Sequence, residues 1–159
     1  MINQILFNRT SHFHLMVKIR QAGKLKIFFK EKYPDRDPQS FGNFADLISI
    51  QFKNFFISYA KSFNKKYDRR GSLFLDNINR KLVLDEVYYT QLIYYIHHNP
   101  VHHGFVKHPD DWPFSSYSIM LSQKSTQLER AEILTWFGAK KDFLKFHQQD
   151  QEINRNDFY

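Results

Sequence analysis

A run of apolar residues spaced by three and four constrains the fold of this chain more than any other feature of its sequence. The run comprises Phe44, Leu47, Ile48, Phe52, Phe55, Phe56, Tyr59 and Phe63. This spacing places the apolar side chains on one face of an α-helix, and Asn43 is a suitable N-cap for it. We therefore predict a long amphipathic helix from Asn43 to about Lys65.

Shorter patterns predict the other elements. Residues Phe13 to Ile19 suit a mostly buried strand. A second helix is expected from Asp85, which can cap it, to Asn99, because Pro100 disfavours helical geometry in the residue before it. The remaining expectations are a strand or irregular hairpin over 72–84, a helix at about Glu129 to Trp136 and an amphipathic stretch over 141–149. Residues 18–37 show no firm period.

Composition excludes several classes of protein. The chain has 159 residues, no cysteine and a formal net charge of +7. The lack of cysteine excludes disulfides, Cys-based zinc sites and a thiol nucleophile, and it favours a reducing, cytoplasmic setting. No stretch approaches the roughly 18 apolar residues of a membrane span, so no membrane partner is expected. The basic excess favours a polyanionic partner, although many basic proteins only have solvated lysine faces.

Two histidines at the start of the first predicted strand are candidate metal ligands. His12 and His14 are separated by one residue, so both imidazoles point to the same face of an extended strand. Two adjacent nitrogens can hold one divalent cation, but two histidines at a strand start can equally be polar surface. A third ligand is needed to favour the metal site.

The second predicted helix contains another candidate pair. Tyr95 and Asn99 are four residues apart, so their side chains lie on one face of the helix, one turn apart. The helix also has further tyrosines, and an aromatic stripe at helical spacing is more often core packing than a catalytic site. A group of histidines lies near the helix end, and its members are His97, His98, His102 and His103. Spacing alone does not decide whether they are metal ligands, phosphate contacts or solvated surface.

The end of the long predicted helix is strongly basic. Five cations beside Phe63 and Tyr67 form a predicted phosphate-contacting patch, and they are Lys61, Lys65, Lys66, Arg69 and Arg70. The alternative is a solvated helix end, since basic residues suit a helix C-terminus in any case.

Several of these segments together resemble the REP-associated tyrosine transposases, which belong to the single-tyrosine, HUH-type insertion-sequence transposases. His12-Phe13-His14 matches the family's His-hydrophobic-His motif. The segment YYIHHNPVHHGFVKHPDDWPFSSY, over 94–117, is similar to its helix-end signature. FNKKYDRRGSLF, over 63–74, resembles its basic connector, and the resemblance extends to EILTWFGAKKDFLKFH over 132–147.

The resemblance implies an α+β fold, namely a ferredoxin-like HUH endonuclease domain with an antiparallel sheet and helices on one face. This domain would cover residues 1–121, and a helical C-terminal extension would cover 122–159. Only Met1 to Ser11 precede His12, so the domain is expected to be N-terminally truncated, with the family's first strand-helix unit missing or severely shortened.

The resemblance also implies an activity, the metal-dependent cutting and rejoining of single-stranded DNA beside a hairpin. Tyr95 would attack the scissile phosphate and form a 5′-phosphotyrosine link. A phenol with a pKa near 10 is a poor nucleophile at neutral pH, so Mg²⁺ or Mn²⁺ would supply much of the rate. His12, His14 and Asn99 would bind that ion.

An alternative function is a module derived from such a transposase that binds single-stranded hairpin DNA without cutting it. The basic connector and stacking aromatics would suffice for binding. Both interpretations predict DNA as the partner and a cytoplasmic, nucleoid-associated protein. They leave open a monomer or a homodimer.

Overall fold

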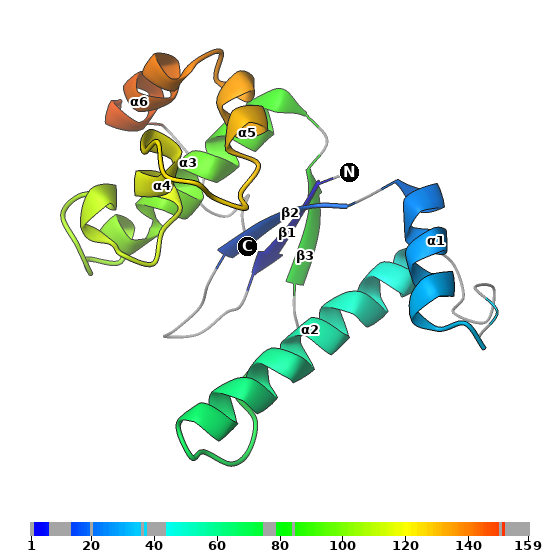
Figure 1. Ribbon diagram of the computed structural model, residues 1–159. Coiled ribbons are helices and arrows are strands. Elements are labelled where there is room, and N and C mark those ends of the chain that lie inside the picture. Colours follow the sequence, from blue (N-terminus) through cyan, green and yellow to red (C-terminus); the bar gives the residue numbers. More distant parts are fainter. Residues whose placement is uncertain are drawn as a thin grey trace.

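The computed structural model describes residues 2–6, 14–19, 21–35, 37, 44–74, 79–83, 85–149 and 151. Helices account for most of these residues, and three short strands form one sheet (Figure 1). In chain order the elements are β1 (Ile2–Leu6), β2 (His14–Lys18), α1 (Ala22–Lys32), α2 (Phe44–Lys66), β3 (Asn79–Val83), α3 (Glu86–His102), the 3-10 helix η2 (Pro109–Asp111), α4 (Tyr117–Leu121), α5 (Arg130–Trp136) and α6 (Lys140–Gln148).

The sheet has the strand order β2-β1-β3, and β1 is antiparallel to both neighbours. Ile2 lies opposite Lys18 of β2 and Val83 of β3. The short stretch before His12 therefore contributes the central strand of the sheet, although its sequence gave no strand pattern. The predicted strand over 13–19 is confirmed as β2, which is an edge strand and carries His14.

Helices lie against both faces of β2. Met16 packs against the core around α3, whereas its neighbour Leu15 packs against Phe56 of α2. Successive side chains of a strand point to opposite faces, so apolar residues at consecutive positions bury both faces. The expected ferredoxin-like fold, with an antiparallel sheet covered on one face, is therefore wrong: the described chain is mainly helical around a small sheet.

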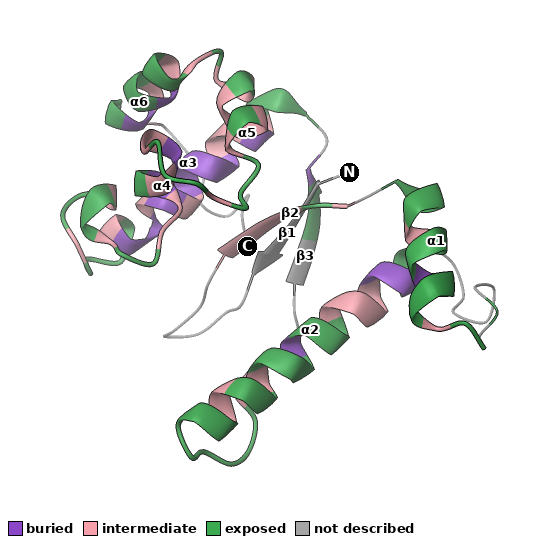
Figure 2. Ribbon diagram, in the orientation of Figure 1, coloured by how far each residue is buried: buried purple, intermediate pink, exposed green. Residues whose placement is uncertain are grey.

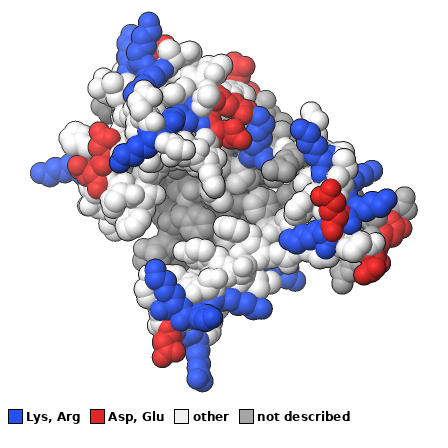
Figure 3. All heavy atoms as spheres, viewed as in Figure 1, with Lys and Arg blue, Asp and Glu red and all other residues white. Residues whose placement is uncertain are grey.

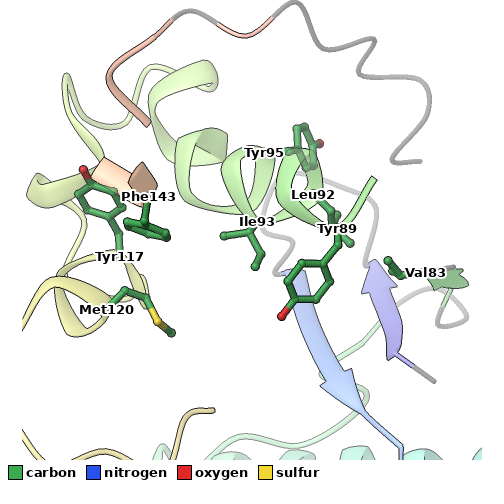
Figure 4. Packing of buried hydrophobic residues seen from close by; sticks show 8 residues of the cluster. All are labelled: Val83, Tyr89, Leu92, Ile93, Tyr95, Tyr117, Met120 and Phe143. Atoms are coloured by element: carbon green, nitrogen blue, oxygen red, sulfur yellow. The ribbon is translucent and has the colours of Figure 1, made fainter. Parts of the chain in front are cut away.

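Helix α3 is the centre of the core (Figure 2). Its buried residues include Tyr89, Leu92 and Ile93, and they share one hydrophobic cluster with Tyr117 of α4 and Phe143 of α6 (Figure 4). The helix predicted over 129–136 is confirmed as α5, and the amphipathic stretch over 141–149 lies mostly in helix α6. The division after residue 121 stays a prediction; α6 contributes to the same core as α3.

The ends of α3 show one correct and one wrong prediction. Asp85 caps the helix as expected, because its carboxylate accepts a hydrogen bond of 2.7 Å from the Tyr88 amide. The expected end at Asn99 is wrong, since α3 continues through Pro100 to His102. Pro100 cannot donate a helical hydrogen bond, but it is buried in the core at the last turn, and Gly104 follows the helix with a φ of +72°.

The other long helix extends away from this core. Helix α2 confirms the amphipathic helix predicted from the apolar spacing, and its C-terminal end lies far from α3 (Figure 1). Helix α1, which the sequence did not predict, lies beside the N-terminal part of α2 (Figure 1). Within the described part of the chain, no helix combines the length and the apolar character that a membrane span requires.

Candidate functional site

The side chain of Tyr95 lies between α3 and β2 and is only 1% exposed. His14 of β2 meets its ring edge-on, with 5.1 Å between the ring centroids and an interplanar angle of 81°. Asn99, one turn further along α3, donates from Nδ2 to the Tyr95 hydroxyl oxygen at 3.4 Å. The structure thus brings together three of the four residues predicted for catalysis and metal binding. The fourth, His12, lies outside the described residues.

A cavity of about 390 Å³ lies next to this group. Its wall is formed by β2, α3 and the segment 112–116, with further residues from α4, α5 and the turn before α5. His14 and Asn99 line the cavity, whereas Tyr95 is absent from the described residues that do so. Tyr95 and Ile93 project from opposite sides of α3 (Figure 4). Because Tyr95 is only 1% exposed, its hydroxyl is covered in this conformation.

Two of the three predicted metal ligands lie in the described part of the chain. The Asn99 amide nitrogen faces Tyr95, which leaves its carbonyl oxygen as a ligand atom. An amide oxygen and the His14 imidazole form a mixed oxygen and nitrogen set that fits Mn²⁺, and Mg²⁺ less well. His12 would be the third ligand. The described residues contain no group of three or more His, Asp or Glu that could hold a metal ion.

A second polar group lies on another face of α3. His97 is 2% exposed, and its Nδ1 lies 2.9 Å from Nε2 of His147 on α6. Its Nε2 lies 2.8 Å from the hydroxyl oxygen of Ser116. Nδ1 of His147 in turn lies 2.9 Å from the backbone carbonyl oxygen of Phe143. The cavity wall is thus connected to α6 by a continuous chain of hydrogen bonds.

Burial keeps both imidazoles of this chain neutral near pH 7. Desolvation, followed by the charges of His147 and His98, holds the pKa of His97 well below its usual value. Desolvation also lowers the pKa of His147 to about 4, although its hydrogen bond to the Phe143 carbonyl opposes the shift. His97 is therefore a buried structural histidine. His98 stacks on Tyr94, with ring centroids 3.9 Å apart.

The predicted basic patch is fully on the surface. Its five cations are exposed, and they gather at the lower end of the molecule in Figure 3, at the C-terminus of α2. Arg69 lies 5.8 Å from the Phe63 ring centroid, and Lys66 lies 5.3 Å from that of Tyr67. The Phe63 and Tyr67 rings are 4.5 Å apart. The patch therefore combines cations with aromatic faces, but it is remote from Tyr95 (Figure 1).

Most residues that line the cavity were not predicted as site residues, and among them are Trp112, Phe114 and Ser116. Phe114 is 84% exposed, and its ring meets that of Trp112 at 5.5 Å in a T-shaped arrangement. The signal for these three residues was the sequence Trp-Pro-Phe-Ser-Ser-Tyr, which was interpreted only as part of a family signature. The combination of aromatic rings and a hydroxyl is typical of a small-molecule or base-binding wall.

Comparisons of the chain with models of protein families, with curated proteins and with solved structures give no match. The resemblance to tyrosine transposases therefore stays an interpretation of sequence motifs. Function has to be argued from the site itself, since folds and functions are only loosely coupled.

Proposed function

We propose that this protein binds single-stranded DNA and cuts and rejoins it through Tyr95. The observation that carries the proposal is the convergence of His14 and Asn99 on Tyr95, with both residues at the wall of one cavity. A nucleophile, a hydrogen-bond donor to its oxygen and a metal-ligating imidazole are the groups that phosphoryl transfer from DNA to a phenol requires.

The reaction exchanges one phosphate ester bond for another. The Tyr95 oxygen forms a bond to phosphorus, and the bond from phosphorus to the 3′ oxygen of the preceding nucleotide breaks. The phenol loses a proton and the departing 3′ oxygen gains one, so the DNA ends are a 5′-phosphotyrosine and a 3′-hydroxyl. The Asn99 amide would stabilise negative charge on the Tyr95 oxygen through its hydrogen bond. A divalent cation on His12, His14 and Asn99 would polarise the phosphate.

The burial of Tyr95 favours a second candidate, a module that binds single-stranded DNA without cutting it. A side chain that is 1% exposed cannot reach a phosphate in this conformation. The exposed cations and aromatic rings at the end of α2 are sufficient for binding, because they offer phosphate contacts and faces for base stacking.

A covalent adduct separates the two candidates. The protein is incubated with hairpin DNAs that have randomised single-stranded flanks and a 3′ label, because the fragment on the 3′ side stays attached to the tyrosine. With Mn²⁺ we expect a labelled band that migrates with the protein in a denaturing gel, and with EDTA we expect none. Tyr95→Phe should abolish the adduct and leave DNA binding nearly unchanged.

Tyr94→Phe is the matched control. Tyr94 is the preceding residue on α3, about 100° away around the helix, and it is equally buried against His98. The control should still form the adduct. An adduct that persists in Tyr95→Phe rejects Tyr95 as nucleophile, whereas DNA binding by the wild type without any adduct favours the non-cutting module.

A further inference from the structure

The chain of hydrogen bonds through His97 allows only one assignment of donors and acceptors when both of its histidine rings are neutral. A carbonyl oxygen can only accept, so Nδ1 of His147 must carry a proton and donate it to Phe143. A neutral imidazole has one such proton, so Nε2 of His147 is an acceptor, and Nδ1 of His97 must donate to it. Nε2 of His97 is then an acceptor as well, and the Ser116 hydroxyl donates to it.

This direction holds because neither imidazole is charged. His97 and His147 are 2% and 5% exposed, and a second proton on His147 would lie on Nε2, opposite the Nδ1 proton of His97. The hydrogen-bond partners of the two rings are an imidazole, a hydroxyl and a carbonyl, and none of them has a negative charge that would stabilise a buried imidazolium. The hydroxyl proton of Ser116 is thus committed to the protein interior.

Ser116 also lines the cavity. With its proton committed to His97, its oxygen offers only lone pairs to whatever occupies the cavity. The surrounding wall contains the Trp112 and Phe114 rings and apolar side chains such as Met16. A planar ligand with a hydrogen-bond donor at its edge would satisfy both the aromatic rings and the hydroxyl oxygen.

We propose that Ser116 determines specificity in this cavity by accepting a hydrogen bond from an N–H group of an unpaired nucleobase. The assignment of a nucleobase rests on the proposed action on single-stranded DNA, where unpaired bases are present. The exposed Phe114 ring offers a face for stacking, and a volume of about 390 Å³ accommodates one heterocycle.

A catalytic role for Ser116 is less consistent with the same contacts. In a nucleophilic serine the histidine takes up the hydroxyl proton and becomes charged, and a carboxylate usually stabilises that charge. His97 is instead buried against a second imidazole, which offers no negative charge. The chain therefore fixes the hydroxyl in place and does not activate it.

The direction of the chain can be measured directly by nitrogen-15 NMR of the histidine rings. At pH 7.5 we expect both His97 and His147 to be neutral, with the proton on Nδ1 in each ring. A proton on Nε2 of His97 would overturn the proposal, because Ser116 would then accept from His97 and present a donor to the cavity.

The ligand class is tested with nucleosides, which have no phosphate and cannot be cut. We expect 2′-deoxyadenosine to shift the ring signals of His97 in a saturable titration. N6,N6-dimethyl-2′-deoxyadenosine lacks the N–H donors of the amino group and should bind to the wild type about tenfold more weakly. The Ser116→Ala variant should bind 2′-deoxyadenosine about tenfold more weakly than the wild type does. Ser118→Ala, an exposed serine two residues further on α4, is the matched control and should bind like the wild type.

Equal binding of the two nucleosides, or equal binding by wild type and Ser116→Ala, overturns the role of Ser116. No saturable binding of 2′-deoxyadenosine to the wild type overturns the base site. Nucleoside binding by the wild type without any DNA adduct would reject the proposed cutting activity alone.

Discussion

At the scale of single residues, the buried histidines make folding stability depend on pH. The pKa of His147 is about 4 in the folded protein and near 6.5 when unfolded. Between these values the unfolded chain binds more protons, so stability is complete above about pH 6.5 and is lost as the pH falls towards 4. His147 alone corresponds to roughly 3 kcal/mol. The lowered pKa of His97 also makes the protein less stable as the pH falls. His98 is a nearby titratable group that contributes to this lowering.

Urea unfolding at pH 7.5 and pH 4.5 measures this dependence. We expect the free energy of unfolding to be lower at pH 4.5 by a few kcal/mol. His147→Leu should reduce the difference between the two pH values, and His103→Ala, at an exposed position, should preserve it. Equal unfolding free energies of the wild type at the two pH values would contradict the assigned shifts.

A second prediction at this scale concerns the metal. His14→Ala should lose Mn²⁺ binding, because it would remove one of the proposed imidazole ligands, which lines the same cavity as Asn99. His102→Ala, which removes an exposed histidine, should bind like the wild type. Isothermal titration of Mn²⁺ into the three proteins is the measurement, and equal affinity of all three would reject His14 as a ligand.

At the scale of secondary-structure elements, two glycines should respond oppositely to alanine. Gly23 lies within α1 with open space around its Cα, so Gly23→Ala should stabilise the protein by roughly 0.5–1 kcal/mol. Gly104 follows the end of α3 with a φ of +72°. Its backbone N–H donates a hydrogen bond to the Val101 carbonyl oxygen, with 2.9 Å between nitrogen and oxygen. Gly104→Ala should cost roughly 1–2 kcal/mol, because a Cβ disfavours that conformation.

Urea unfolding of the two variants at pH 7.5 checks the signs. Neither site has an atom within 4 Å of the added Cβ, so the difference between them reports backbone conformation and not packing. Stabilisation by Gly104→Ala would show that the left-handed end of α3 is not formed in solution.

The elements differ in how far sequence could predict them. Helices α2 and α3 carry long apolar patterns or a capping Asp, which are local signals, and both were predicted. Strand β1 was not, because five residues are too few for a period and its state depends on pairing with β2 and β3. Helix α1 buries only Phe29 among its side chains, so its apolar period is weak.

The contacts of the candidate site also divide into those that local sequence predicts and those that depend on residues far apart in the chain. The proximity of Tyr95 and Asn99 follows from helical spacing, and it was predicted. The contact of His14 with Tyr95 was implied only by the resemblance to transposases. The chain from Ser116 through His97 to His147 joins residues up to 50 positions apart, and no local pattern encodes such a contact.

At the scale of the whole molecule, Lys and Arg side chains lie on several parts of the visible face, and one group of them lies at the end of α2, far from α3 (Figures 1 and 3). Replacing Lys65, Lys66, Arg69 and Arg70 by Ala should therefore flatten the salt dependence of single-strand binding. Each lost phosphate contact reduces the log slope by about 0.7, so up to roughly three units are expected. Binding measured at several salt concentrations gives the slope.

A second variant controls for net charge alone. It replaces four exposed lysines outside α2 by Ala, namely Lys107, Lys124, Lys141 and Lys145. This variant loses the same charge and should change the slope much less. If the two variants behave alike, general attraction explains the binding and the end of α2 is no specific patch.

The burial of Tyr95 would set an upper limit on the rate of the proposed reaction. If only conformations that open the contacts of Tyr95 can react, the observed rate is the rate of the open form multiplied by the fraction of time it exists. An opening that costs about 2.7 kcal/mol leaves roughly one molecule in a hundred competent. A DNA strand that binds the open form preferentially would raise the fraction of open molecules. The contacts between DNA and the open form would then increase both the affinity for DNA and the rate of the reaction.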